Sequence, residues 1–205
     1  MEVKNLKKKR LLKILLLGEG GVGKTTFVQC LNNKSFNENQ PITPGIDVGV
    51  YKYKQNNIEY YMQLWDFGGQ DRFKFLHDSF IDGAHAVLIF FDLTRPKTLQ
   101  NIDFWINMCV KNNLHVPLLL VGTKLDRYRT EEKWLEKLDM SLILENLNIE
   151  KYDLISSKEK IGLNELIADV VQVINEKEKA KESEKDEKKE NEEENGAKTP
   201  LLYSS

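Results

Sequence analysis

Short apolar runs alternate with segments of helical periodicity along most of the chain. The runs at 13–18, 86–92 and 116–122 are almost continuously apolar, as is typical of strands covered on both faces of a parallel sheet. The stretch 47–64 alternates between apolar and polar residues and indicates an antiparallel hairpin near a sheet edge, with its turn at 55–57. The predicted strands are 13–18, 45–53, 58–66, 86–92, 116–122 and 152–156.

Helical spacing of apolar residues predicts helices within 97–112, 131–146 and 163–174, and a further helix opens at 25–33. Strands and helices in alternation predict an α/β, doubly wound fold. We expect a six-stranded, mostly parallel sheet with one antiparallel edge strand and helices on both faces. Right-handed crossovers would gather the functional loops at the carboxyl ends of the strands.

The composition changes after Ile174. From Glu176 to Lys198 there are ten acidic and seven basic residues, with no apolar side chain larger than alanine, so this segment cannot build a core. Disorder is the simpler interpretation, and a solvated extension of the last helix is the alternative. We therefore expect a basic arm at 1–10, one domain at 11–176 and a charged tail at 177–205.

Composition and charge exclude several classes of protein. The 205 residues carry 30 basic and 32 acidic side chains, a net charge of -2, which argues against general binding to nucleic acid. Cys30 and Cys109 lie in predicted amphipathic helices and are expected to be buried thiols. No apolar run approaches the roughly 20 residues that span a bilayer. We expect a cytoplasmic protein.

Residues 18–25, GEGGVGKT, fit the pattern G-x-x-x-x-G-K-[ST] at every required position. A predicted strand precedes this P-loop and a helix follows it. Glycines let backbone N–H groups point at phosphate oxygens, and the free N–H groups of a helix start favour an anion. Lys24 would reach the outer phosphates and Thr25 would place its hydroxyl on Mg²⁺. The alternative, a glycine turn followed by a chance lysine, does not explain this context.

The motif VGTKLD at 121–126, which we call the base loop, resembles the guanine loop Asn/Thr-Lys-x-Asp of the Ras-like small GTPases. In that family the aspartate, here Asp126, accepts hydrogen bonds from guanine, whereas adenine would leave it unpaired. The stem of Lys124 would lie on the base, and Thr123 stands where asparagine is commoner. The sequence ISSK at 155–158, the closing loop, is similar to the family loop that closes over the base.

Two further motifs are similar to the switch segments of the same family. Thr43 follows Thr25 at the spacing of the threonine that binds Mg²⁺ and the γ-phosphate. Phe36 matches an aromatic residue that packs on the guanine edge, although a core position at a helix end is an alternative. In WDFGGQ at 65–70, Asp66 would hold Mg²⁺ through water, and Gly69 and Gln70 would bind the γ-phosphate and orient the attacking water.

The resemblance covers roughly residues 11–176. The tryptophan and double glycine of WDFGGQ resemble the Arf branch, and the remaining motifs indicate a divergent Rab-like or septation-type member. We interpret Arg95, in FDLTR, as a helix-cap or surface residue and not as a built-in arginine finger. The implied catalytic residues are Gln70, Lys24 and Thr43, and the implied metal ligands are Thr25, Thr43 and Asp66. The implied nucleotide contacts are Gly18, Gly20, Gly21, Val22, Gly23, Lys24, Thr25, Thr26, Phe36, Thr43, Gly69, Thr123, Lys124, Asp126, Ser156, Ser157 and Lys158.

The resemblance implies a monomeric switch that binds GTP or GDP with Mg²⁺ and hydrolyses GTP slowly. Effectors, exchange factors and activating proteins would contact the first switch region, 38–53, and the second switch region, 67–82. A protein that binds GTP without hydrolysing it, and a P-loop ATPase or nucleotide kinase, are the alternatives. Without a lipidation motif, we expect at most weak membrane contact through the basic arm.

Overall fold

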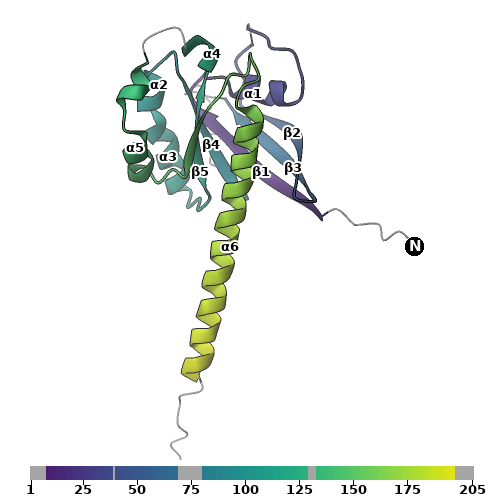
Figure 1. Cartoon of the computed structure of the whole chain (residues 1–205), viewed down its shortest axis with the longest axis vertical. Coiled ribbons are helices and arrows are strands. Elements are labelled where there is room, and N and C mark those ends of the chain that lie inside the picture. The colour runs from purple at the N-terminus through teal and green to yellow at the C-terminus, as the bar shows by residue number, and fades with distance from the viewer. Residues whose placement is uncertain (1–7, 39, 69–79, 129–132, 197–205) are drawn as a thin grey trace, which may run out of the picture.

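The computed structural model describes residues 8–38, 40–68, 80–128 and 133–196, with side chains as far as residue 185. Across these residues the strands form one six-stranded sheet in the order β2-β3-β1-β4-β5-β6. Every neighbouring pair is parallel except β2 with β3, which confirms the predicted sheet (Figure 1). The strands are β1 (Lys8–Gly18), β2 (Ile46–Gln55), β3 (Ile58–Phe67), β4 (Ala86–Asp92), β5 (Leu118–Thr123) and β6 (Lys151–Leu154).

The antiparallel edge is a tight hairpin between β2 and β3. Gln55 faces Ile58 across the pair, so Asn56 and Asn57 alone form the turn. Both have positive φ, 48° and 62°, as a type I′ hairpin turn requires and as asparagine tolerates. The predicted hairpin and the position of its turn are confirmed.

The core lies on both faces of the sheet, and β1 supplies each face from alternate residues. Leu16 belongs to the cluster that packs with α1 (Lys24–Leu31) and α6 (Leu163–Gly196). Leu17 belongs to the cluster on the other face, with α3 (Ile102–Lys111). Cys30 and Cys109 are free and buried, one on each face, as predicted. Strand β1 is thus covered on both sides, which explains its continuous apolar run.

Two predicted helices are divided in the structure. The helix expected at 97–112 is α2 (Lys97–Gln100) and α3, separated at Asn101. The one expected at 131–146 is a 3₁₀ turn, η2 (Trp134–Lys137), and α5 (Met140–Asn146). The Asp139 side chain caps α5 by accepting from Leu142 N at 3.1 Å, and Leu138 before it is extended, so the helix restarts there. The remaining short helix is α4 (Leu125–Tyr128).

The ends of the predicted domain also differ from their expected positions. Strand β1 starts at Lys8, within the segment expected as a free arm. Of the two alternatives for the tail, the structure has the helix: α6 continues to Gly196 and extends beyond the sheet (Figure 1). Its contacts with the body reach Lys181, which donates to the His115 carbonyl at 3.2 Å. Glutamate, lysine and alanine are strong helix formers, so a core is not needed to continue it.

None of the helices described is both long and apolar enough to cross a membrane.

Candidate nucleotide-binding site

The P-loop joins β1 to α1 and surrounds the side chain of Lys24. This side chain is buried, and its Nζ donates to the carbonyl oxygens of Gly18 at 2.7 Å and Glu19 at 2.8 Å. Gly18 has φ +134°, and a Cβ there would lie 2.4 Å from the Phe90 carbonyl oxygen, so only glycine fits. The loop therefore holds the ammonium group of Lys24 inside it, and the motif predicts that this group contacts the outer phosphates.

A cavity opens where the P-loop, the base loop and the closing loop meet, at the carboxyl ends of the parallel strands. Phe36 lies in its wall, 39 % exposed, rather than in the core. Three of the predicted nucleotide contacts, Gly18, Val22 and Ser156, do not line the cavity. Two further predicted residues, Gly69 and Gln70, lie outside the described residues. The predicted residues in the wall are Gly20, Gly21, Gly23, Lys24, Thr25, Thr26, Phe36, Thr43, Asp66, Thr123, Lys124, Asp126, Ser157 and Lys158.

The three predicted metal ligands meet in this cavity. The hydroxyl groups of Thr25 and Thr43 lie 2.7 Å apart, and both donate to Oδ2 of Asp66. Oδ1 of Asp66 is buried without a hydrogen-bond partner among the described residues. Hydroxyl and carboxylate oxygens, one of them unpaired, suit a hard cation such as Mg²⁺. The residues present fit the metal that the resemblance implies.

Burial perturbs the two charged groups at this end of the cavity in opposite ways. It raises the pKa of Asp66, although the hydrogen bond from Thr25 and the charge of Lys24 oppose the rise. It lowers the pKa of Lys24 to about 8, with Asp66 opposing the change and Arg95 adding to it. A phosphate chain would supply negative charge beside Lys24, and a divalent cation would supply positive charge beside Asp66.

At the other end of the cavity, a buried serine orients Asp126. Ser156 Oγ donates to Asp126 Oδ1 at 2.6 Å and accepts from Glu159 N at 3.1 Å. Ser156 is fully buried, whereas Asp126 lines the cavity. The closing loop and the base loop, about thirty residues apart in the chain, therefore hold one carboxylate in a fixed position.

The base loop is also tied to the P-loop and to β4. The hydroxyl of Thr123 donates to the Val22 carbonyl oxygen at 2.6 Å. Lys124 has a positive φ of 61°, and its Nζ donates to Asp92 Oδ2 at 2.6 Å. Threonine at position 123 thus keeps a direct bond between the two loops.

Sequence reasoning gave no role to Asp92 or Gly68 and did not predict the contacts of Arg95. Arg95 lies at the surface, as predicted, and its guanidinium also bonds Asp92 and the Gly20 carbonyl oxygen. Gly68 N donates to the Gly45 carbonyl at 2.7 Å, which joins the two switch regions. Two features of the sequence could have indicated these residues. Asp92 ends a buried strand, and Gly68 follows the predicted metal ligand Asp66 by two positions.

The sequence is similar to those of known proteins. The family model of the Ras family matches residues 13–176. Rab-19 of Homo sapiens is 33% identical over 169 residues, covering 76% of this chain and 78% of that protein. Rab-7b of Paramecium octaurelia is 29% identical over 180 residues, covering 85% of this chain and 86% of its own. The chain therefore belongs to the Ras family and is a Rab-like small GTPase.

Proposed function

We propose that the cavity binds GTP and GDP, with the base held between the base loop and the closing loop. Asp126 would accept from guanine N1–H and the 2-amino group, and the stem of Lys124 and the ring of Phe36 would pack against the base. The backbone N–H of Ser157 would reach the guanine oxygen, and Lys158 would pack beside the base. The support is the Ser156–Asp126 bond of 2.6 Å, which orients a carboxylate in the cavity that also contains the P-loop.

The phosphates would lie along the P-loop, with Lys24 on their outer oxygens. Thr25, Thr43 and Asp66 would hold Mg²⁺, which when bound neutralises negative charge on the phosphate oxygens. Gln70 would orient the water that attacks the γ-phosphorus in line, and Gly69 N–H would bond the γ-phosphate. No arginine is assigned to the γ-phosphate here, so we expect intrinsic turnover on the order of 10⁻⁴ to 10⁻³ s⁻¹.

Small GTPases of this family act with effectors, exchange factors and activating proteins. We propose that in this chain these partners contact 38–53 and 67–82, because the bond between Gly68 and Gly45 couples the two segments. Loss of the γ-phosphate would release Thr43 and Gly69 together. We further propose a cytoplasmic monomer that makes at most weak contact with membranes through residues 1–10.

The convergence of Thr25, Thr43 and Asp66 on one point of the cavity carries the proposal, because a GTPase needs its metal there. The test is purified protein in three assays: competition of GDP against ADP, GTP binding with and without a chelator, and single-turnover hydrolysis. We expect guanine preference, dependence on Mg²⁺ and slow turnover. Equal binding of ADP would overturn the base assignment.

Measured hydrolysis rates distinguish a GTPase switch from the alternative, a protein that binds GTP without hydrolysing it. Gln70→Leu and Gly20→Val should each reduce hydrolysis stimulated by an activating partner, by about 10³-fold or more. Gln70→Leu would leave the attacking water unoriented, and Gly20→Val would crowd it. Unchanged single-turnover rates in both variants would contradict the roles of these residues, while GDP affinity serves as the control for folding.

A further inference from the structure

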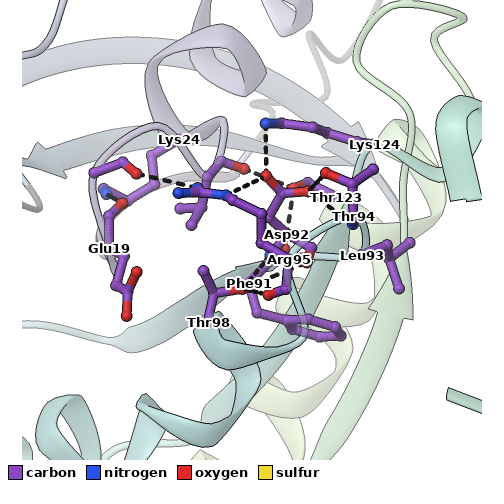
Figure 2. Close-up of polar contacts among 12 residues, drawn as sticks. Glu19, Lys24, Phe91, Asp92, Leu93, Thr94, Arg95, Thr98, Thr123 and Lys124 are labelled. Atoms are coloured by element: carbon purple, nitrogen blue, oxygen red, sulfur yellow. Dashed lines mark hydrogen bonds and ion pairs between the residues drawn. The ribbon is translucent and has the colours of Figure 1, made fainter. Parts of the chain in front are cut away.

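Asp92, the last residue of β4, is a fully buried carboxylate shared by two loops of the site (Figure 2). Its Oδ1 accepts from Thr94 N at 2.9 Å and from Thr94 Oγ1 at 2.7 Å. Its Oδ2 accepts from Arg95 Nε at 2.8 Å and from Lys124 Nζ at 2.6 Å. One buried anion thus has two cationic partners, of which Lys124 belongs to the base loop.

Arg95 extends this cluster to the phosphate end of the cavity. Its Nη2 donates to the Gly20 carbonyl oxygen at 3.1 Å, a contact between residues 75 positions apart. The same nitrogen lies 3.8 Å from the point where a Cβ of Gly21 would be. Nε and Nη2 point in parallel from one edge of the planar guanidinium, so this side chain can bond the carboxylate and the carbonyl together.

Charge explains why this arrangement is stable. Burial alone would raise the pKa of Asp92, but hydrogen bonds from Lys124, Thr94 and Arg95 outweigh it, and the pKa is lowered. The carboxylate is therefore ionised at neutral pH, and its two cationic partners leave a net positive charge beside the P-loop. Arg95 also contributes to the lowered pKa of Lys24, so its field reaches the phosphate position.

We propose that Arg95 is a positioning residue that braces the P-loop against Asp92, and that Asp92, by holding Lys124 as well, couples the phosphate loop to the base loop and prolongs nucleotide binding. The inference rests on the proposed binding of guanine nucleotide. The Gly20 carbonyl has to stay in place for the loop to keep its N–H groups inward, and Arg95 anchors it from outside the cavity. Loss of the brace would let either loop open without the other.

The test is the dissociation rate of a fluorescent GDP, displaced by excess GDP, from loaded wild type and variants. Arg95→Ala should release it about tenfold faster, on the scale of one charge-assisted hydrogen bond. Arg95→Lys should not restore slow release, because one ammonium cannot bond the carboxylate and the carbonyl in the same way. Lys97→Ala is the matched control: it removes a nearby exposed charge and should leave the rate unchanged.

Single-turnover hydrolysis of preloaded GTP separates bracing from direct chemistry. Arg95→Ala should hydrolyse GTP within about twofold of wild type, whereas a group that acts on the γ-phosphate would cost about 10³-fold or more. A loss of that size with unchanged GDP release would overturn the brace. Asp92→Asn and Arg95→Ala should also be non-additive in release, and additive effects would contradict a shared anchor.

Two failures are distinguishable. If wild type does not retain fluorescent GDP, the proposed nucleotide site is wrong. If wild type retains it and Arg95→Ala, with an unchanged melting temperature, releases it at the wild-type rate, the brace alone is wrong.

Discussion

At the phosphate end of the cavity, many groups of one loop surround the position proposed for the phosphates, whereas at the base end the proposed recognition depends on one carboxylate, Asp126. Carbonyl and N–H groups of the P-loop are fixed by backbone conformation, and Lys24 lies inside them. Asp126 depends on a side-chain bond from Ser156. Where many groups bind the ligand, the loss of one side chain should reduce affinity only slightly. Where one side chain makes the contact, its loss should reduce affinity strongly. Substitutions at both ends of the cavity and in the strands that support them test this difference.

Asp126→Asn should have the largest effect. Its amide nitrogen would face the guanine amino group, donor against donor, so GTP affinity should fall on the order of 10³-fold. Xanthosine triphosphate, with a carbonyl at that position, should instead bind the variant better than wild type. Titration calorimetry with both nucleotides measures the change.

Thr26→Ala is the matched variant at the phosphate end, because Thr26 lines the same cavity but its backbone N–H remains after substitution. GTP affinity should fall by about fivefold or less, the scale of one ordinary hydrogen bond. Equal losses in Thr26→Ala and Asp126→Asn would remove the contrast between the two ends.

The sequence predicts those parts of the site that are local in the chain. The P-loop and the base loop each fit within eight residues, so their chemistry appears as a spacing, and the alternation of strands and helices places them at one edge of the sheet. The bond from Arg95 to Gly20 joins residues 75 positions apart. No periodicity reports such a contact, since it depends on how β4 lies beside β1.

The prediction of one continuous helix over 131–146 is wrong for a different physical reason. Apolar spacing alone predicts one helix over 131–146, but Leu138 and Leu142 are 39 % and 53 % exposed. The carboxylate of Asp139 binds a backbone N–H of α5 and starts a new helix there. A cap of this kind outweighs a moderate hydrophobic pattern, because it satisfies backbone groups that the pattern ignores.

Gly68→Ala should have an intermediate effect, confined to the phosphate end. A Cβ at Gly68 would lie 2.5 Å from the Thr43 carbonyl oxygen and 2.9 Å from the Gly45 carbonyl oxygen. The first switch region would have to move, and Thr43 would move with it. We expect GTP affinity in Mg²⁺ to fall about tenfold, the scale of one overpacked contact.

GDP affinity of Gly68→Ala is the internal control, because the proposed base contacts do not involve Gly68. It should stay within about twofold of wild type, measured in the same titrations. Equal losses of GTP and GDP would show that Gly68 supports the whole cavity and that the two ends are not separable.

The smallest predicted effect is on stability and concerns Asp153 on β6, the strand that leads into the closing loop. Asp92, beneath the P-loop, has three partner residues and a lowered pKa. Asp153, on β6, has Oδ2 buried without a partner among the described residues, and Lys151 pairs with the neighbouring Asp169 at 2.6 Å. Burial and the charge of Asp169 raise the pKa of Asp153 to about 6. The fully buried carboxylate of Asp92 therefore stabilises the fold at neutral pH, and the half-buried carboxylate of Asp153 destabilises it.

Asp153→Asn should therefore increase the free energy of unfolding at pH 7.5. The folded state binds this proton more tightly than the unfolded state, so the wild type carries the full cost above pH 6 and loses it as pH falls through 6 towards 4. Because the carboxyl is partly solvated, we expect a gain of about 1 kcal/mol, or about 3 °C in melting temperature. The gain should vanish near pH 4, where both side chains are neutral in the folded state. An equal gain at pH 4 and pH 7.5 in denaturant titrations would contradict the charge of Asp153 as its cause. The contrast between a stabilising carboxylate at Asp92 and a destabilising one at Asp153 would then be wrong.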